Sequence, residues 1–390
     1  MKPRLRAIRR LPVVLLLATR CSGPCTIALN ASLAPVERQL TSGPGGRILC
    51  NTGVWSPDSQ SVVYDTRSDS EGAVFDGKTI QMVNVVTGEV KEVYRARHGA
   101  RCGVVTFHPR EWKVVFILGP EHPTDEWQYC AWHRRGVIVE VRQPGRKVNL
   151  DARDLVPPFT PGALRGGSHV HLWDAAGEWV SFTYEDDLLA RLSAPTPTND
   201  INQRNVGVSV PGIPVRVRHA HPRNHDGEYF TALTTRTVAE PQPGSDEIQR
   251  AYEESWVGTN GYVRQDGVGQ RHALAFQGQV LTRSSRPVSE VLIVDLPNDP
   301  TKPGLGPLCG TATRAPCPPQ GTHQRRLTYT ADRKFPGIQG PRHWLRSSPD
   351  GSQIAFLMKD NAGGAQLWAV SPNGSTFRPR IWPRFRSGGC

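Results

Sequence analysis

The feature that most constrains the fold of this chain is a short sequence phrase that returns along its length. The phrase is a turn rich in Ser, Pro, Asp and Gly followed by a β-branched or aromatic strand, and it reads WSPDSQSVVY at 55–64 and SSPDGSQIAF at 347–356. Pro presets φ in such a turn, Asp closes it with its side chain, and Gly accepts a positive φ. The apolar residues that follow are typical of a buried strand. The repeat therefore predicts a fold assembled from similar β units.

Weaker copies of the phrase lie between these two, and each again places a turn before apolar residues. They occupy residues 107–116, 174–182 and 225–230. Hairpins follow the first and last copies, at 80–94 and 366–374. The long gap before the last copy contains two apolar segments, 273–276 and 291–295, which predict one further unit that has lost the phrase.

These units predict an all-β fold, a β-propeller of four-stranded blades with about 40–50 residues each. A β-sandwich also has many short strands, but it does not repeat its turn chemistry. The propeller is expected at 35–375, after a leader at 1–34 and before an atypical basic tail at 376–390. The tail departs from the repeated pattern and predicts a truncated or frame-shifted end, which would leave the ring of blades incomplete.

The leader has the pattern of an export signal, because basic residues precede a short apolar stretch at 11–18. This pattern predicts a periplasmic or secreted protein, and the alternative is a cytoplasmic protein whose start is mis-assigned. No other stretch has the length of a membrane span. Cys309 and Cys317 flank a Pro-rich loop and would be able to form a disulfide in an exported protein.

The distribution of charge argues against a nucleic-acid partner. The formal net charge is +12 at pH 7. Six basic residues and no acid lie in 1–28, and four basic residues and no acid lie in 376–390, which leaves only +2 for the propeller body. The global charge therefore gives no support for binding to DNA or RNA.

Histidines are the residues most able to carry chemistry here. Four of them precede predicted blades: His169, His171, His221 and His343. Alternate side chains of a strand face the same way, about 7 Å apart, so the first two are expected to present both imidazoles to the mouth of the central channel. The four would together hold a divalent metal ion, Mn, Zn or Ca. The alternative is a polar channel without a metal.

Three arginines beside these histidines would take a carboxylate in a bidentate manner: Arg165, Arg223 and Arg342. Glu185 is expected to support the site from an acidic run, 185–187, that is otherwise predicted to be a solvated turn. Residues 246–256 are the best helix candidate, with Ser245 as the cap.

The repeated phrase, with Arg-x-Leu-Thr at 38–41 and a related Arg-Leu-Thr at 326–328, resembles the TolB-type propellers of bacteria over about residues 36–375. More narrowly, the chain resembles an uncharacterised bacterial family of such propellers. The segments that carry this likeness are 166–171, 180–185, 243–248 and 340–344. The resemblance implies six to seven blades in the complete fold and no agreed activity.

Oligogalacturonate lyases are similar propellers, in which a Gln-x-x-His-x-His arrangement holds a divalent metal that acidifies the proton beside a uronate carboxylate. This chain matches that arrangement in part. The pair His169 and His171 is present, but Gly166 stands where the family has Gln. Gln339 precedes His343 by four positions and not by three. The resemblance therefore implies Gln339 as a further ligand-binding residue only in this weaker form.

Two classes of function follow. The first is a non-catalytic binding or scaffold protein of the cell envelope, whose partner is a protein or an acidic oligosaccharide. The second is a metal-dependent lyase or hydrolase that acts on acidic oligosaccharides. Nucleotide and serine-hydrolase functions have no positive support, because the chain has no P-loop, GxGxxG, GxSxG or HExxH signature.

Overall fold

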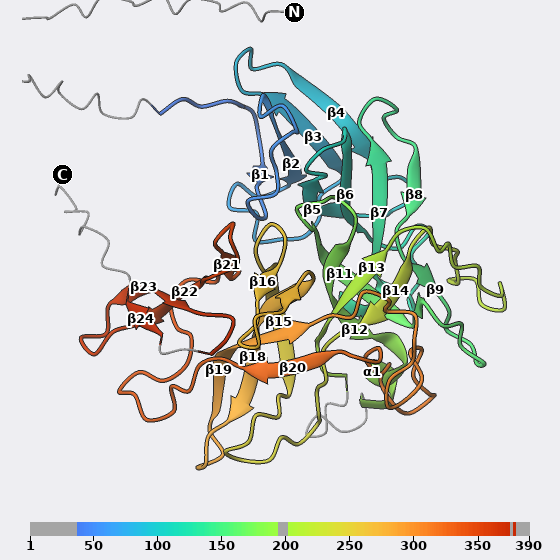
Figure 1. Ribbon diagram of the computed structural model, residues 1–390. Helices are drawn as coiled ribbons and strands as arrows, with labels where there is room; N and C mark the ends of the chain where they lie inside the picture. The colour runs from blue at the N-terminus through green and yellow to red at the C-terminus, as the bar shows by residue number, and fades with distance from the viewer. Residues whose placement is uncertain (1–36, 194–201, 375–376, 380–390) are drawn as a thin grey trace, which may run out of the picture. The chain divides into compact units, whose positions relative to one another are not determined.

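The residues that the structure describes form five four-stranded antiparallel sheets, which follow one another along the sequence (Figure 1). The structure is a computed structural model that describes residues 37–193, 202–374 and 377–379. Within each sheet the strands pair in the order of the sequence, so each sheet is a meander. We call these sheets blades 1 to 5.

The strands of the blades are these. Blade 1 contains β1 (Gly46–Ile48), β2 (Ser61–Arg67), β3 (Thr79–Asn84) and β4 (Val90–Arg95). Blade 2 contains β5 (Cys102–Phe107), β6 (Lys113–Leu118), β7 (Arg135–Glu140) and β8 (Lys147–Asn149). Blade 3 contains β11 (Gly166–Trp173), β12 (Val180–Asp186), β13 (Asn205–Val210) and β14 (Phe230–Leu233).

Blade 4 contains β15 (Arg250–Trp256), β18 (Ala273–Leu281), β19 (Pro287–Asp295) and β20 (His323–Arg326). Blade 5 contains β21 (Arg346–Ser347), β22 (Ile354–Lys359), β23 (Ala365–Val370) and β24 (Arg378–Pro379). Two ribbons of two strands lie outside the blades, formed by β9 (Ala152–Arg153) with β10 (Ala163–Leu164) and by β16 (Tyr262–Val263) with β17 (Gly269–Gln270).

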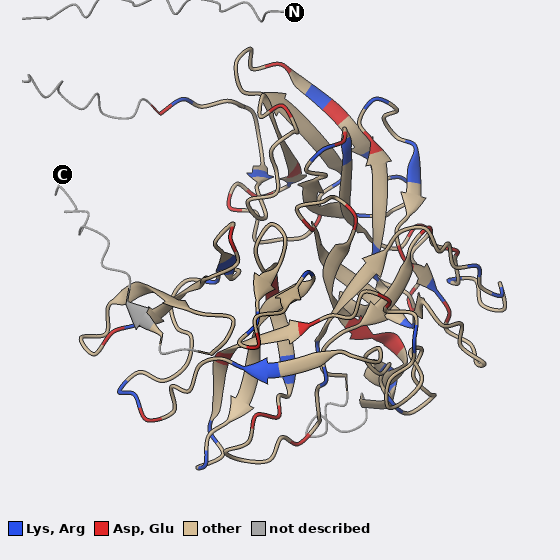
Figure 2. Ribbon diagram, in the orientation of Figure 1, with Lys and Arg blue, Asp and Glu red and all other residues tan. Residues whose placement is uncertain are grey.

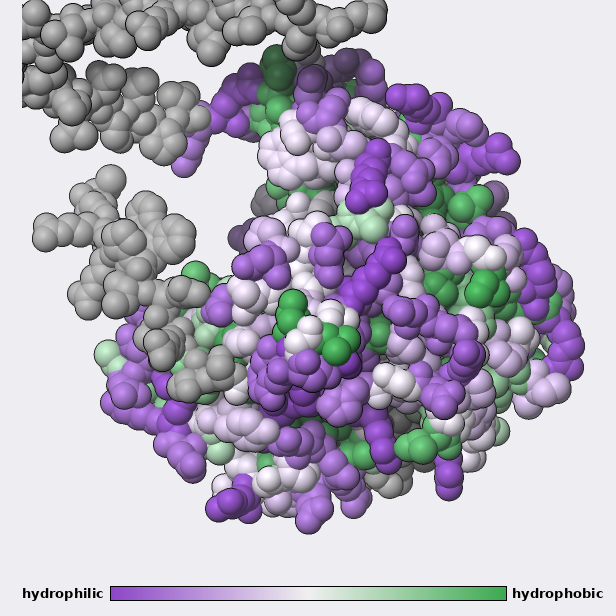
Figure 3. Space-filling view, viewed as in Figure 1, coloured by the Kyte–Doolittle hydropathy of each residue, from purple (hydrophilic) through white to green (hydrophobic). Residues whose placement is uncertain are grey.

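The hydrophobic cores lie between successive blades. Each joins buried side chains of one blade to those of the next, for example Val63 with Phe116, Val115 with Val180, Val208 with Phe276, and Ile293 with Phe356. Polar residues dominate the face seen in Figure 3, where apolar side chains form small separate groups. Consecutive four-stranded meanders that pack face to face are the architecture of a β-propeller, which confirms the predicted fold class.

The turn before the second strand is built alike in blades 1 and 5. Oγ of Ser56 donates to Oδ1 of Asp58 over 2.6 Å, and Oγ of Ser348 donates to Oδ1 of Asp350 over 2.5 Å. In both turns the serine Oγ also accepts the backbone N–H five residues later. These hydrogen bonds lower the pKa of both aspartates, that of Asp350 to about 2. The repeated phrase thus reflects a repeated hydrogen-bond network.

Two predicted segments fold differently. The turn at 225–227 leads into β14, the fourth strand of blade 3, and does not begin a new blade. The predicted helix at 246–256 is wrong, because Arg250–Trp256 is the strand β15 and pairs with β18. Pairing across the sheet overrides the local helix signal there. The predicted diverged unit is confirmed as blade 4, where β18 and β19 are neighbours.

Helices are few in the described residues, which contain the 3₁₀-helix η1 (Ala131–His133) and the α-helix α1 (Asp187–Ser193). Within these ranges no helix has both the length and the apolar character needed to cross a bilayer. Cys309 and Cys317 are free thiols, so the structure does not contain the predicted disulfide. The predicted leader and nearly all of the predicted tail lie outside the described residues.

The first strands of blades 2, 3 and 4 share a β-bulge. The register shifts between Gly103 and Thr106 in β5, between His169 and Leu172 in β11, and between Tyr252 and Ser255 in β15. Each bulge contains a residue with positive φ, namely Val104, Val170 and Glu253. A bulge adds one residue to one strand and so interrupts the alternation of side chains between the two faces. The bulge in β11 includes the predicted pair His169 and His171, so these two side chains need not share a face.

Candidate functional site

The bulge in β11 turns His169 and His171 to opposite faces of blade 3. Nδ1 of His169 lies 3.1 Å from Oγ1 of Thr183, whereas the ring of His171 lies beside Phe182, with centroids 6.2 Å apart. Thr183 and Phe182 are successive residues of β12, so their side chains project to opposite faces. The prediction that both imidazoles share one face is therefore wrong.

His171 is buried between blades 2 and 3, and Gly136 leaves the space for its ring, since a Cβ at Gly136 would lie 2.6 Å from Nε2. Burial lowers the pKa of His171 to about 3. Burial also lowers the pKa of His169, and the nearby guanidinium groups of Arg134, Arg204 and Arg342 lower it further. Both imidazoles are therefore neutral near pH 7.

His343 and Gln339 are held by backbone groups. Nε2 of His343 accepts the N–H of Leu357 over 3.0 Å, and its Nδ1 lies 2.9 Å from the carbonyl oxygen of Pro341. The side-chain amide of Gln339 donates to the carbonyl of Pro336 over 2.7 Å. Across residues 37–193, 202–374 and 377–379, no group of three or more His, Cys, Asp or Glu side chains is placed to hold a metal ion. The predicted four-histidine metal site is not assembled there.

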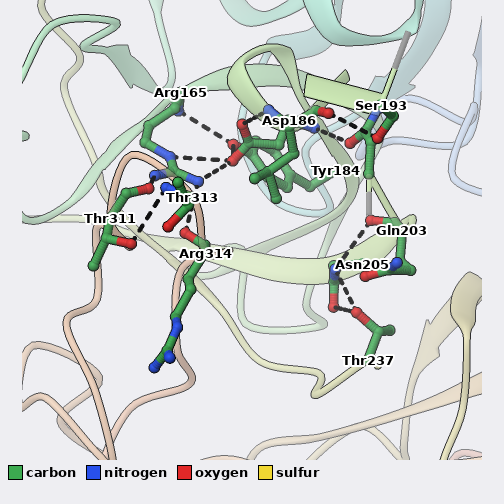
Figure 4. Close-up of polar contacts among 12 residues, drawn as sticks. Arg165, Tyr184, Asp186, Ser193, Gln203, Asn205, Thr237, Thr311, Thr313 and Arg314 are labelled. Atoms are coloured by element: carbon green, nitrogen blue, oxygen red, sulfur yellow. Dashed lines mark hydrogen bonds and ion pairs between the residues drawn. The ribbon is translucent and has the colours of Figure 1, made fainter. Parts of the chain in front are cut away.

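The side chain of Arg165 is buried beside blade 3 and points toward Asp186 (Figure 4). Its guanidinium donates to Oδ2 of Asp186 over 3.1 and 2.5 Å, and it also donates to the carbonyl oxygens of Thr311 and Arg314. The side chain of Arg165 is 0% exposed. Burial opposes its charge, but Asp186 raises the pKa of Arg165 above the ordinary value. Arg165 is therefore paired in the interior with Asp186 and does not line the cavity described below.

The acidic run 185–187 is buried, contrary to the predicted solvated turn, because each carboxylate pairs with a basic group. Asp186 binds Arg165 and Asp187 binds Arg191. Glu185 accepts two hydrogen bonds from Arg204, of 2.7 and 2.5 Å.

Arg342 has a similar partner, since its Nε donates to Oε1 of Glu253 over 2.6 Å. Two of the predicted site residues therefore form ion pairs: Glu185 pairs with Arg204, and Arg342 pairs with Glu253. The basic members of both pairs influence the pKa of His169.

The other two predicted residues, His221 and Arg223, line a cavity of about 680 Å³. Its wall is formed by the segment after β6, by η1 and the start of β7, by β9, by α1 and by the segment 221–225. The basic and aromatic groups of the wall are His122, Trp127, His133, Arg135, Arg153, Arg191, His221, Arg223 and His225. A volume of this size is ordinary for a small-molecule site.

Trp127 organises the basic groups of this cavity. Its ring stacks on His133 with centroids 3.6 Å apart. The guanidinium carbons of Arg153, Arg191 and Arg223 lie 5.6, 5.7 and 5.7 Å from its centroid. Guanidinium groups at this distance are attracted by the indole quadrupole, so one buried tryptophan holds three positive charges close together.

Two of these arginines have no carboxylate within salt-bridge distance among the residues that the structure describes. Arg223 donates to the carbonyl oxygens of Glu121 and His122, both over 2.8 Å. Arg153 donates to the carbonyl oxygens of Gly166 and Arg134. Arg191, in contrast, is paired with an acid of its own helix. The cavity wall thus contains two arginines whose charge is not matched by a direct ion pair in the described residues.

Burial is the main cause of the pKa shifts in the cavity wall. Burial lowers the pKa of Arg153 to about 10, although the charge of Asp151 opposes this. Burial, and then neighbouring arginines, also lower the pKa of His221 and His225. An anion that enters the cavity would reverse these shifts, since it stabilises the charged form of each group.

Sequence reasoning missed Trp127, His133, Arg153 and Arg191. They come from separate segments and have no motif spacing in common. The only available signal was an aromatic residue in the connection between β6 and β7, which does not reveal the arginines that surround it.

The chain has relatives at the level of sequence. Residues 101–225 match a family described as "Protein of unknown function (DUF3748)", and this segment contains every residue that lines the cavity. The chain is also 50% identical over 345 residues to the uncharacterized protein YidR of Escherichia coli strain K12, a match that covers 87% of this chain and 78% of that protein. The chain belongs to the YidR family.

The solved structures that resemble this YidR-family chain are more distant. TolB from Acinetobacter baumannii is 11% identical, with a TM-score of 0.42, and the match covers 86% of this chain and 54% of that one. The oligogalacturonate lyase from Vibrio parahaemolyticus is 13% identical, with a TM-score of 0.44, and the match covers 87% and 67%. The chain spans about half the length of that TolB chain.

Proposed function

We propose that this YidR-family propeller is a non-catalytic binding protein of the cell envelope, and that its cavity takes an acidic oligosaccharide. The observation that carries the proposal is the pair Arg153 and Arg223. Both lie in the cavity wall beside Trp127, donate to carbonyl oxygens, and form no ion pair in the described residues, so their charge is open to a ligand. A planar guanidinium matches the two oxygens of a uronate carboxylate. The location in the envelope rests on the export-like pattern of residues 1–34.

The same geometry gives no support to the lyase hypothesis. That chemistry would require several histidines around one metal ion, as in the arrangement that the sequence resembles in part. In the described ranges His171 lies between blades, His343 is bonded to the backbone of blade 5, and His221 lines the cavity. The binding hypothesis needs only the arginines.

The proposal is tested by calorimetric titration of oligogalacturonate into the purified full chain. We expect binding in the wild-type protein and a loss of affinity on the order of tenfold or more in Arg223→Gln, because a charge-assisted bidentate contact is removed. Arg218→Gln is the matched control, since Arg218 is an exposed arginine just before the segment 221–225. It donates to the carbonyl oxygens of Val156 and Pro158 and does not line the cavity.

Absence of binding to any acidic oligosaccharide would overturn the proposal. So would equal losses in Arg223→Gln and Arg218→Gln, because the cavity would then not be the binding site. Cell fractionation with an antibody against the native protein checks the envelope location independently.

A further inference from the structure

A second hollow lies beside the cavity, on blades 1 and 2. It has a volume of about 620 Å³ and is lined by the end of β4, the segment after it and the connection from β7 to β8. Its basic side chains are Arg95, Arg97, Arg146 and Lys147. Figure 2 shows Lys and Arg colours on parts of β4 and β8. We call this hollow the basic groove.

The basic groove and the cavity meet at Glu121, which lines both. The Glu121 carboxylate accepts Arg135 of the cavity over 2.6 Å and Lys147 of the groove over 2.5 Å. Two histidines make a second connection. His98 of the groove stacks on His122 of the cavity with centroids 4.4 Å apart, and the backbone N–H of His122 donates to the carbonyl of His98 over 2.7 Å. The two hollows are therefore neighbours that share Glu121 as a lining residue.

Positive charge exceeds negative charge along this combined surface. Each hollow has four Lys or Arg side chains, and the carboxylates that line them are Glu92, Glu121 and Glu126. Glu92 is engaged by Arg95, and Glu121 by Arg135 and Lys147. Arg97 and Arg146 are exposed and, in the part of the chain described, form no ion pair.

We propose that the basic groove extends the cavity into one binding surface for a polyanionic chain, and that this chain is an acidic polysaccharide with several uronate units. The inference rests on the proposed function of the cavity and adds the length of its ligand. A polyanion with regularly spaced carboxylates would pair with Arg153 and Arg223 in the cavity and with Arg97 and Arg146 in the groove. Contacts at two linked positions raise affinity beyond that of either alone.

The aromatic side chains of the surface favour a polysaccharide over a single-stranded nucleic acid. Single-stranded nucleic acids are bound without sequence preference by stacking of bases on exposed aromatic rings. Here the Trp and Tyr that line the two hollows, Trp127 and Tyr94, are each 4% exposed. Neither presents a free ring face to a base, whereas arginine forks need only anionic oxygens.

The experiment is a titration of the full chain with oligogalacturonates of increasing length. We expect affinity to rise roughly tenfold to a hundredfold from short to long oligomers and then to level off. The double variant Arg97→Gln/Arg146→Gln removes two exposed charges of the groove, and we expect it to abolish this gain while short oligomers bind as in the wild type. Arg110→Gln/Arg142→Gln is the matched control, because both are exposed arginines outside the two hollows.

The outcomes separate this inference from the proposed function. Binding of short oligomers that depends on Arg223, with no gain for longer ones, would overturn the extended surface and leave the cavity proposal intact. Absence of binding at every length would overturn both. A single-stranded RNA that binds more tightly than the long oligogalacturonate, and depends on the same groove arginines, would overturn the choice of a polysaccharide.

Discussion

Arg165 in blade 3 and Arg223 in the cavity wall are both arginines that sequence reasoning assigned to one ligand site, and their surroundings differ in one decisive respect. Arg165 has a carboxylate of its own, Asp186, in a buried site. Arg223 has carbonyl oxygens as its partners. A carbonyl orients a guanidinium without cancelling its charge, whereas a carboxylate does both.

The hydrogen-bond partners of an arginine therefore indicate its role in this protein. An arginine that is buried with an acid stabilises the fold, and its removal leaves an unpaired charge. An arginine fixed by carbonyl groups at the edge of a cavity keeps a charge that a ligand can use. Substitutions at acids and arginines of both kinds test this distinction.

Asp186→Asn should destabilise the protein most. It leaves the guanidinium of Arg165 buried without its acid, and removal of one partner of a buried ion pair costs about 3–5 kcal/mol. Chemical denaturation followed by tryptophan fluorescence measures the change. Asp58→Asn removes an acid from an exposed turn and serves as the control. A loss below about 1 kcal/mol would show that this pair has no such structural role.

Glu254→Gln should stabilise the protein at alkaline pH. Glu254 is buried without a guanidinium partner, and burial raises its pKa from 4.5 to about 8. Because the native-state pKa is the higher one, stability is fully present below pH 4.5 and declines as pH rises through 8, by at most about 1.4 kcal/mol per pH unit.

Glutamine cannot ionise and keeps an oxygen for the hydroxyl of Ser181, which lies 3.5 Å from Glu254. Denaturation midpoints measured from pH 5 to pH 9 should therefore fall less for the variant than for the wild type. Parallel profiles would mean that Glu254 does not hold its proton in the native state.

Arg153→Gln tests an arginine that has features of both Arg165 and Arg223. Arg153 is buried like the first and lines the cavity like the second. We expect a stability loss of about 1–3 kcal/mol, because buried carbonyl groups lose their donor, together with weaker binding of oligogalacturonate. Denaturation and calorimetry on the same preparation measure both. Full affinity in a destabilised variant would assign Arg153 to the fold alone.

Glu126→Gln should have the smallest effect and the opposite sign for binding. Glu126 is an exposed acid in the cavity wall. Its removal should strengthen oligogalacturonate binding roughly two- to fivefold, as expected when one exposed like charge is removed, with little change in stability. Weaker binding in this variant would indicate that Glu126 contacts the ligand directly.

Predictions that depend on interactions between residues close in sequence agree with the structure better than predictions that depend on distant residues. The Ser-Pro-Asp turns of blades 1 and 5 formed as expected, because their hydrogen bonds join residues at most five positions apart. The strands at 273–276 and 291–295 were also found correctly, since an apolar β-branched run indicates burial wherever it lies. The helix predicted at 246–256 was wrong because Arg250–Trp256 pairs with β18, which lies later in the sequence.

The candidate site was predicted less well than the fold, and the bulge in β11 shows why. A regular strand would have placed His169 and His171 on one face, but the one inserted residue of the bulge places them on opposite faces. Nothing local in the sequence marks that insertion, which depends on the register with β12. The resemblance to an uncharacterised family, in contrast, was correctly predicted, since the chain is 50% identical over 345 residues to an uncharacterized protein.

The repeated β unit, its turn chemistry and the fold class can be predicted from the sequence, because strand alternation and turn hydrogen bonds act over a few residues. Which arginines are paired with a carboxylate and which are not depends on the tertiary structure. Arg165, which lies just before β11, pairs with Asp186 at the end of β12, and Arg153 and Arg223 lie around Trp127 although they come from separate segments. Electrostatic interaction depends on distance in space and on burial, and neither quantity can be read from spacing along the chain.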